Sequence, residues 1–143
     1  MKYVNIERTN SSFDGLALGT ILRAIHKETE GLVWSIQFIQ GVGDISGVVG
    51  FRMLELEKRC HMSPHGVIIS YEKLLEMAEA CDDIVDLLVV GCVDEGSVPK
   101  AYREENWEEK CEVVFLYEDS TIWSLYARDP AVMAIFESLQ SQE

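Results

Sequence analysis

Residues 112–140 constrain the fold most, because they read as two strands and a helix in direct succession. The run Val113–Tyr117 contains five β-forming residues, and a second β-rich run, 121–127, follows after Asp119 and Ser120. Aspartate and serine are common turn residues, so strands are predicted near residues 112–118 and 121–127 and together form a hairpin.

The length of the turn sets the register of this hairpin. A two-residue turn places Leu116 opposite Trp123 and Val114 opposite Leu125, whereas a longer turn shifts the pairing, and the sequence leaves both open.

A helix is predicted after the hairpin, near residues 130–140. Asp129 suits the N-cap and Pro130 the first helical position. Apolar residues then recur at helical spacing, at Val132, Ile135, Phe136 and Leu139.

Periodicity also predicts the other elements. Further strands are expected near residues 2–8, 32–40, 48–57 and 84–93, and helices near 13–30 and 70–82, with Val67–Ile69 as a short strand or lead-in. The strands near 32–40 and 48–57 would form a hairpin across the glycine-rich segment 41–50. We therefore expect one α+β domain over residues 1–143, with a mainly antiparallel sheet of about six strands covered by about three helices.

Composition and the placement of apolar residues and cysteines indicate a folded protein in the cytoplasm. The chain of 143 residues is 48% hydrophobic, which argues against disorder. The sequence has no apolar run of membrane-spanning length and no signal-peptide core near its first residues, so a cytoplasmic location is expected. The cysteines form no CxxC pair, which favours free thiols in or near the core at Cys60, Cys81, Cys92 and Cys111.

Charge is distributed unevenly along the chain. The formal net charge is -13, yet residues 1–70 hold seven acids and seven bases. Residues 71–143 hold the other 18 acids and five bases, so they carry the whole excess. This asymmetry disfavours nucleic acid and anionic membranes as partners and favours a basic protein.

No motif predicts a cofactor or a metal. The glycine-rich segment 41–50 departs from a dinucleotide fingerprint in its third spacing and precedes an expected strand rather than a helix. Cys60, His61 and His65 form the one metal-like group, but their spacing needs further ligands from elsewhere. Cys60 beside His61 also lacks a third group to orient a nucleophile. Paired carboxylates occur with no sign of a sugar cleft between them.

An acidic segment around Trp107 is the strongest candidate for a binding surface. Acidic runs are usually solvated faces, but a tryptophan in their midst suits an interface anchor. We therefore expect Trp107 to be exposed and Trp123 to belong to the core. The predicted partner-binding residues are Asp94, Glu95, Glu104, Glu105, Trp107, Glu108 and Glu109.

The second half of the chain resembles the cytosolic immunity proteins of bacterial polymorphic and contact-dependent toxin systems. The resemblance lies in VVFLYEDS at residues 113–120, in Trp123, Tyr126 and Asp129, and in the helix SYEKLLEMAEACDD from Ser70. It implies a non-enzymatic protein whose acidic face occludes a cognate basic toxin, often a nuclease.

Two other classes stay open at this point. One is a small cytosolic enzyme or metal-dependent sensor that uses Cys60, His61 and His65. The other is an oligomeric scaffold. A homodimer also stays open among the expected partners. A toxin gene directly upstream would favour the immunity protein, and a metabolic operon would favour the enzyme.

Overall fold

A computed structural model describes residues 2–7, 17–100 and 103–141. They contain one six-stranded sheet in the order β1-β6-β5-β4-β2-β3, and each neighbouring pair of strands is antiparallel. The strands are β1 Val4–Glu7, β2 Val33–Gly43, β3 Val67–Ile69, β4 Cys81–Cys92, β5 Val113–Glu118 and β6 Ile122–Ala127. The predicted α+β class with an antiparallel sheet of six strands is confirmed.

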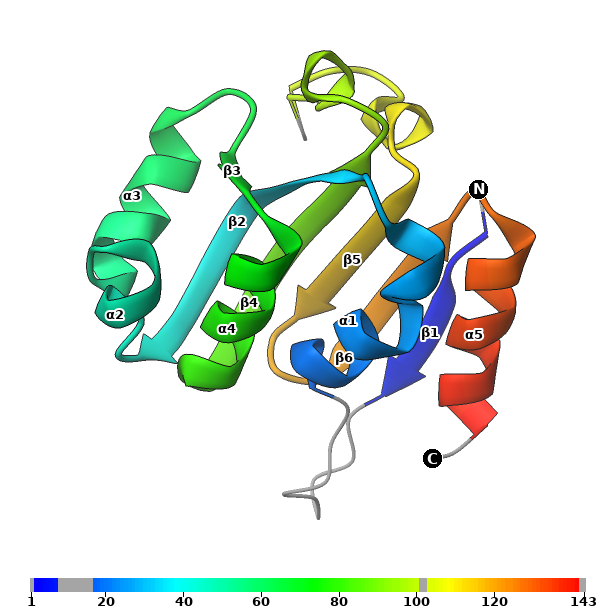
Figure 1. The fold of residues 1–143 in the computed structure, drawn as a ribbon, viewed down its shortest axis with the longest axis horizontal. Coiled ribbons are helices and arrows are strands. Elements are labelled where there is room, and N and C mark those ends of the chain that lie inside the picture. The colour runs from blue at the N-terminus through cyan, green and yellow to red at the C-terminus, as the bar shows by residue number, and fades with distance from the viewer. Residues whose placement is uncertain (1, 8–16, 101–102, 142–143) are drawn as a thin grey trace.

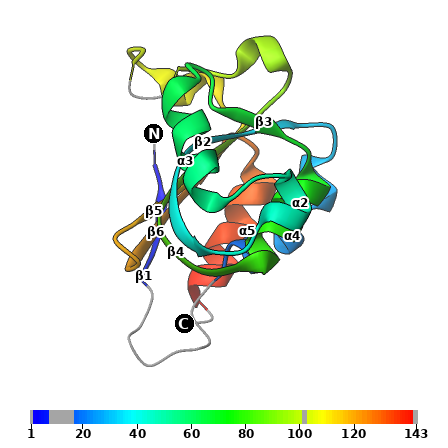
Figure 2. The same ribbon diagram turned by 90° about the vertical axis from the view of Figure 1, so that its left-hand side faces the viewer.

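The helices lie mainly on one side of this sheet (Figures 1 and 2). They are α1 Leu18–Ile25, α2 Ser46–Val49, α3 Met53–Met62, α4 Tyr71–Ala80 and α5 Pro130–Ser141. Short 3-10 turns occur at η1 Lys27–Thr29, η2 Glu95–Ser97 and η3 Trp107–Lys110. The main core lies between the helices and the sheet, and Trp34, Phe115, Trp123 and Phe136 are among its largest buried side chains. No helix in the described ranges is long and apolar enough to cross a membrane.

The predicted strand near residues 48–57 is wrong. This segment forms α2 and the first half of α3, and left-handed Gly50, with a φ of 83°, ends α2. Met53, Leu56 and Cys60 recur at a spacing of three and four and bury one helical face in the main core. The hairpin across residues 41–50 is therefore also wrong, and β3 supplies the sixth strand.

The predicted helix near residues 13–30 is shorter in the described part. Helix α1 ends at Ile25 and continues as the 3-10 turn η1. Gly31 adopts a φ of 83°, which is the left-handed conformation expected of a glycine that ends a helical segment. The part of this prediction that falls on residues 13–16 lies outside the described residues.

The hairpin of β5 and β6 has the longer of the two turns. Glu118 pairs with Ile122, so Asp119, Ser120 and Thr121 form the loop, and Trp123 faces Tyr117 rather than Leu116. Asp119 and Ser120 both have positive φ, of 54° and 57°. The Asp86 carboxylate on β4 accepts the Asp119 backbone N–H at 2.8 Å, and the Val85 carbonyl accepts that of Ser120 at 2.8 Å. The neighbouring strand therefore helps to set the turn.

Gly66→Ala is expected to cost roughly 3 kcal/mol or more of stability, because left-handed strain adds to overpacking there. Gly66 has a φ of 71°, and a Cβ at this position would meet the Ile36 carbonyl oxygen at 2.5 Å. Gly50→Ala is the matched control, since its φ is 83° but nothing lies within 4 Å of the place that a Cβ would take. The control should cost about 1 kcal/mol. Urea unfolding measures both changes, and equal losses would show that the close approach at Gly66 does not matter.

Candidate functional site

The predicted acidic segment forms a loop between β4 and β5, which we call the acidic loop (residues 93–112). It lies above one end of the sheet and includes η2 and η3 (Figure 1). Residues 101–102 of this loop are outside the described part. All seven predicted partner-binding residues belong to it, so the fold brings them into one region.

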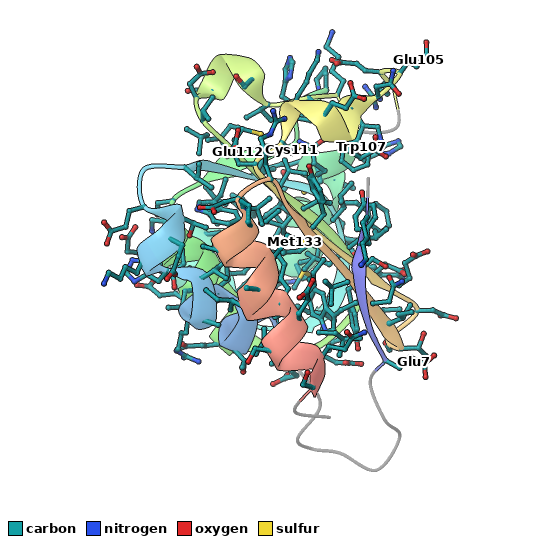
Figure 3. The ribbon with its side chains drawn as sticks, turned by 90° about the vertical axis from the view of Figure 1, so that its right-hand side faces the viewer. Glu7, Glu105, Trp107, Cys111, Glu112 and Met133 are labelled. Carbon is teal, nitrogen blue, oxygen red and sulfur yellow. The ribbon has the colours of Figure 1, made fainter. Side chains whose placement is uncertain are left out.

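Trp107 is buried, and the prediction that it is exposed is wrong. Its exposed fraction is 8%, against 2% for Trp123, which is in the main core as predicted. Trp107 belongs to a second apolar cluster with Leu88, Val90, Cys92, Val98, Cys111 and Val114. In Figure 3, Glu105 lies at the outer end of the acidic loop and Trp107 nearer the sheet. The indole therefore holds the acidic loop against the sheet and is not exposed to a partner.

Internal bonds hold the acidic loop in shape. The Asp94 carboxylate accepts the backbone N–H and the hydroxyl of Ser97, both at 2.8 Å. Glu104 pairs with the Lys110 ammonium at 2.5 Å and accepts the Lys100 N–H at 3.2 Å. These contacts hold the pKa of the Glu104 carboxyl below its usual value, the Lys110 bond contributing most. Asp94 and Glu104 thus use their carboxylates for bonds within the loop.

The other predicted acids face solvent. Glu95, Glu105 and Glu109 are exposed and Glu108 is half-buried. Their carboxylates make no hydrogen bond or ion pair to another residue of the described ranges. These four charges are therefore available to a partner, and the loop geometry fixes where they stand.

Contacts at several points join the acidic loop to the rest of the fold, and the Arg128 guanidinium donates to the Glu109 carbonyl. Arg103 donates to the His61 carbonyl at 3.2 Å, and the Val98 carbonyl lies 3.0 Å from the His65 Nδ1. At the far end, Arg128 lies 3.6 Å from the Glu112 carboxylate. The loop is thus attached to α3, to the turn before β3 and to the end of β6.

Cys60, His61 and His65 do not converge on one site. Cys60 points into the main core at 4% exposure, and burial raises the pKa of its thiol to about 12. His61 and His65 are exposed. No three His, Cys, Asp or Glu side chains among the described residues are placed to hold a metal ion. The absence of a metal and of catalysis remain predictions.

All four cysteines are free thiols, as expected, and three of them are buried. Cys92 and Cys111 lie together in the second cluster, where a hydrogen bond between their thiols lowers the pKa of Cys92 and raises that of Cys111. The raised pKa of Cys111 has more than one cause. The hydrogen bond and burial are the larger causes, and Glu108 contributes less.

The sheet face opposite the helices, which we call the open face, was not singled out from the sequence. The acidic loop covers the end of it that carries the second cluster. Below that end, the pairing registers align one row of residues across five strands, Asn5, Ser124, Leu116, Leu88 and Phe38. No helix of the described chain covers this row (Figure 2).

Phe38 is the most exposed apolar side chain of this row, at 48%. It borders a shallow depression of about 390 Å³, whose other lining residues include Leu88, Leu116, Asp86 and Glu118. Strict alternation along residues 32–38 would place Phe38 on the same side of the sheet as Trp34 and Ile36. A β-bulge between Ile36 and Phe38 instead turns Phe38 to the open face, opposite Leu88. The open face therefore presents an exposed Phe38 beside Asp86 on β4 and Glu118 on β5. Sequence periodicity did not reveal this surface.

Comparisons with known proteins add no relative from which a site could be transferred. No family model, curated protein or solved structure matches the chain.

Proposed function

We propose that this chain is a non-enzymatic binding protein that neutralises a basic partner by covering its surface. The partner would be a cognate toxin, with a nuclease as the favoured activity, and the protein would act in the cytoplasm. This is the function implied by the resemblance of residues 70–129 to immunity proteins. The net charge of -13 supports a basic partner independently of that resemblance.

The observation that carries the proposal is the anchored acidic loop. Trp107 holds the loop on the sheet, and Asp94 and Glu104 brace it internally. Glu105 and Glu109 then stand in solvent at fixed positions. Because these contacts hold the described part of the loop in shape before binding, association loses less conformational entropy than it would with a flexible loop. Concentrated charge also steers a basic partner towards this end of the molecule.

The alternative of an enzyme or sensor at Cys60 has less support. A thiol with a pKa near 12 is protonated at neutral pH, whereas a nucleophile or metal ligand must be a thiolate. No observation on the described residues favours a plain scaffold over a binding protein.

Charge reversal in the acidic loop tests the proposal. The probe is the purified basic protein encoded beside this chain's gene, and its association is followed by biolayer interferometry. Changing Glu105, Glu108 and Glu109 to lysine should lower the association rate constant roughly 10- to 100-fold, because electrostatic steering is reversed. Glu104 is left intact because its bond to Lys110 braces the loop.

A control with the same charge change separates local from overall charge. Glu72 and Glu76 on α4 and Glu137 on α5 are exposed and belong to the helical layer. Their triple change to lysine should slow association far less. The proposal would be contradicted if both variants slowed association equally or if the wild type did not bind the basic protein. Neighbouring genes that encode only metabolic enzymes would also contradict it.

A further inference from the structure

We propose that the depression on the open face is a second contact surface for the same basic partner, with Phe38 as its apolar anchor. The inference rests on the proposed function and adds the site and the chemistry of the contact. The partner would place an aliphatic or aromatic side chain against Phe38 and basic side chains against the neighbouring acids. Phe38 thereby takes the role that the sequence assigned to Trp107.

The apolar part of this surface is built by strand pairing. Phe38 pairs with Leu88, Leu88 with Leu116, and Leu116 with Ser124. Leu88 is fully buried and Leu116 half-buried, so the floor is rigid and Phe38 stands beside it at 48% exposure. Aromatic side chains often serve as interface anchors once a partner buries them, and the exposed Phe38 beside this apolar floor suits that role.

The chemistry of the partner follows from the charges at the lower border of the depression. Asp86 and Glu118 line it, and Glu7 continues the same end of the sheet through the pairing of Ile122 with both Glu118 and Glu7. Figure 3 shows Glu7 at the lower end of β1, far from the acidic loop at the top. Neither Glu7 nor Glu118 has an ion-pair partner among the described residues. Like charges on neighbouring strands repel, and a basic surface would relieve that repulsion.

A second copy of this chain fits the surface poorly. Two open faces packed together would bring Asp86, Glu118 and Glu7 of one copy close either to the same acids or to the acidic loop of the other, depending on their relative orientation. One base, Arg103, lines a neighbouring hollow that shares Phe38 with the depression, and its guanidinium donates to the His61 carbonyl. A basic protein meets no such conflict, so charge complementarity favours it over a homodimer.

One partner can cover both surfaces. Leu88 and Leu116 line the depression, and both also belong to or pack against the cluster beneath the acidic loop. The loop and the depression are therefore continuous on one side of the molecule. A specific interface buries about 800 Å² on each partner, and two adjoining surfaces together suit a contact of that size.

Phe38→Ala tests the inference, with the neighbour-encoded basic protein as the probe. The dissociation rate constant should rise about tenfold or more while the association rate constant changes little, since loss of an apolar anchor acts mainly on dissociation. Ile68→Ala is the control: Ile68 has a similar exposure of 41%, lies on β3 beyond β2 and does not line the depression. It should leave dissociation within about twofold of the wild type.

The outcomes separate this inference from the proposed function. If the loop reversal at Glu105, Glu108 and Glu109 slows association while Phe38→Ala dissociates like the wild type, the second contact is refuted and the proposed function stands. If the wild type does not bind the basic protein, both fail. A dimer of the isolated chain that is lost in Phe38→Ala, measured by sedimentation velocity, would replace the basic partner by a second copy. Should Phe38→Ala fail to fold, Glu118→Lys at an exposed position tests the same border, and unchanged dissociation would overturn the inference.

Discussion

Replacing Trp107 by alanine is expected to lower the free energy of unfolding by about 3 kcal/mol, the lower end of the range for a buried aromatic. The indole is 8% exposed and packs in the second cluster with side chains of β4 and β5. Its removal leaves a cavity under the acidic loop, so backbone amides of residues 103–111 should also lose protection from hydrogen exchange. Urea unfolding and native-state exchange measure the two effects.

Trp123→Ala provides the comparison. Trp123 is 2% exposed in the main core and stacks on Tyr117 with ring centroids 4.3 Å apart, so its loss should cost roughly 3–5 kcal/mol. Unlike Trp107→Ala, it should not selectively expose the acidic loop to exchange. If Trp107→Ala left the midpoint of unfolding unchanged, the anchoring role of Trp107 would be wrong and the sequence-based expectation of an exposed tryptophan would be restored.

The elements that the sequence predicted well are those with dense local signals. The hairpin of β5 and β6 combines β-forming runs with turn residues. Helix α5 has an N-cap whose Asp129 carboxylate accepts the Ala131 N–H at 2.9 Å, and Ser70 caps α4 by accepting the Lys73 N–H at 3.2 Å. Such signals depend on residues close in sequence and need no knowledge of the tertiary fold.

The wrong predictions lie where tertiary packing selects one of two local structures that the sequence allows. The apolar residues of segment 48–57 fit both an alternating and a helical period, and the helix is selected because Met53 and Leu56 pack into the core beside β2. Trp107 stands among acids in the sequence, yet a single 3-10 turn directs its indole to the sheet and leaves Glu109 outside. A bulge in β2 reverses the side on which Phe38 lies. None of these three events has a local sequence signature strong enough to predict it.

The candidate site was therefore predicted in part. The sequence located the acidic segment, because its charge excess is visible in composition, and the fold gathers those residues into one loop. It did not distinguish Asp94 and Glu104, which brace the loop, from Glu105 and Glu109, which face solvent. That distinction depends on side-chain contacts. It also decides which acids belong in a charge-reversal experiment.

Association with the basic partner is expected to slow at least about tenfold between roughly 0.02 M and 0.5 M salt, because added ions screen the attraction that precedes contact. The chain carries a formal charge of -13, all of it from residues 71–143, which include the acidic loop and Glu118. At physiological ionic strength exposed charges interact over only about 8 Å, so the salt dependence reports mainly acids at or near the interface. The dissociation rate constant should depend less on salt if the contact at Phe38 is apolar.

The charge-reversed variant of the acidic loop tests whether the salt dependence comes from this loop. With Glu105, Glu108 and Glu109 changed to lysine, the association rate should show a much shallower salt dependence, while the control changed at Glu72, Glu76 and Glu137 should keep most of the wild-type slope. Stopped-flow or interferometric association rates over a salt series measure both variants. A wild-type association rate that does not change with salt would mean that the exposed acids are a solvated surface, because steering by charge cannot act without being screened.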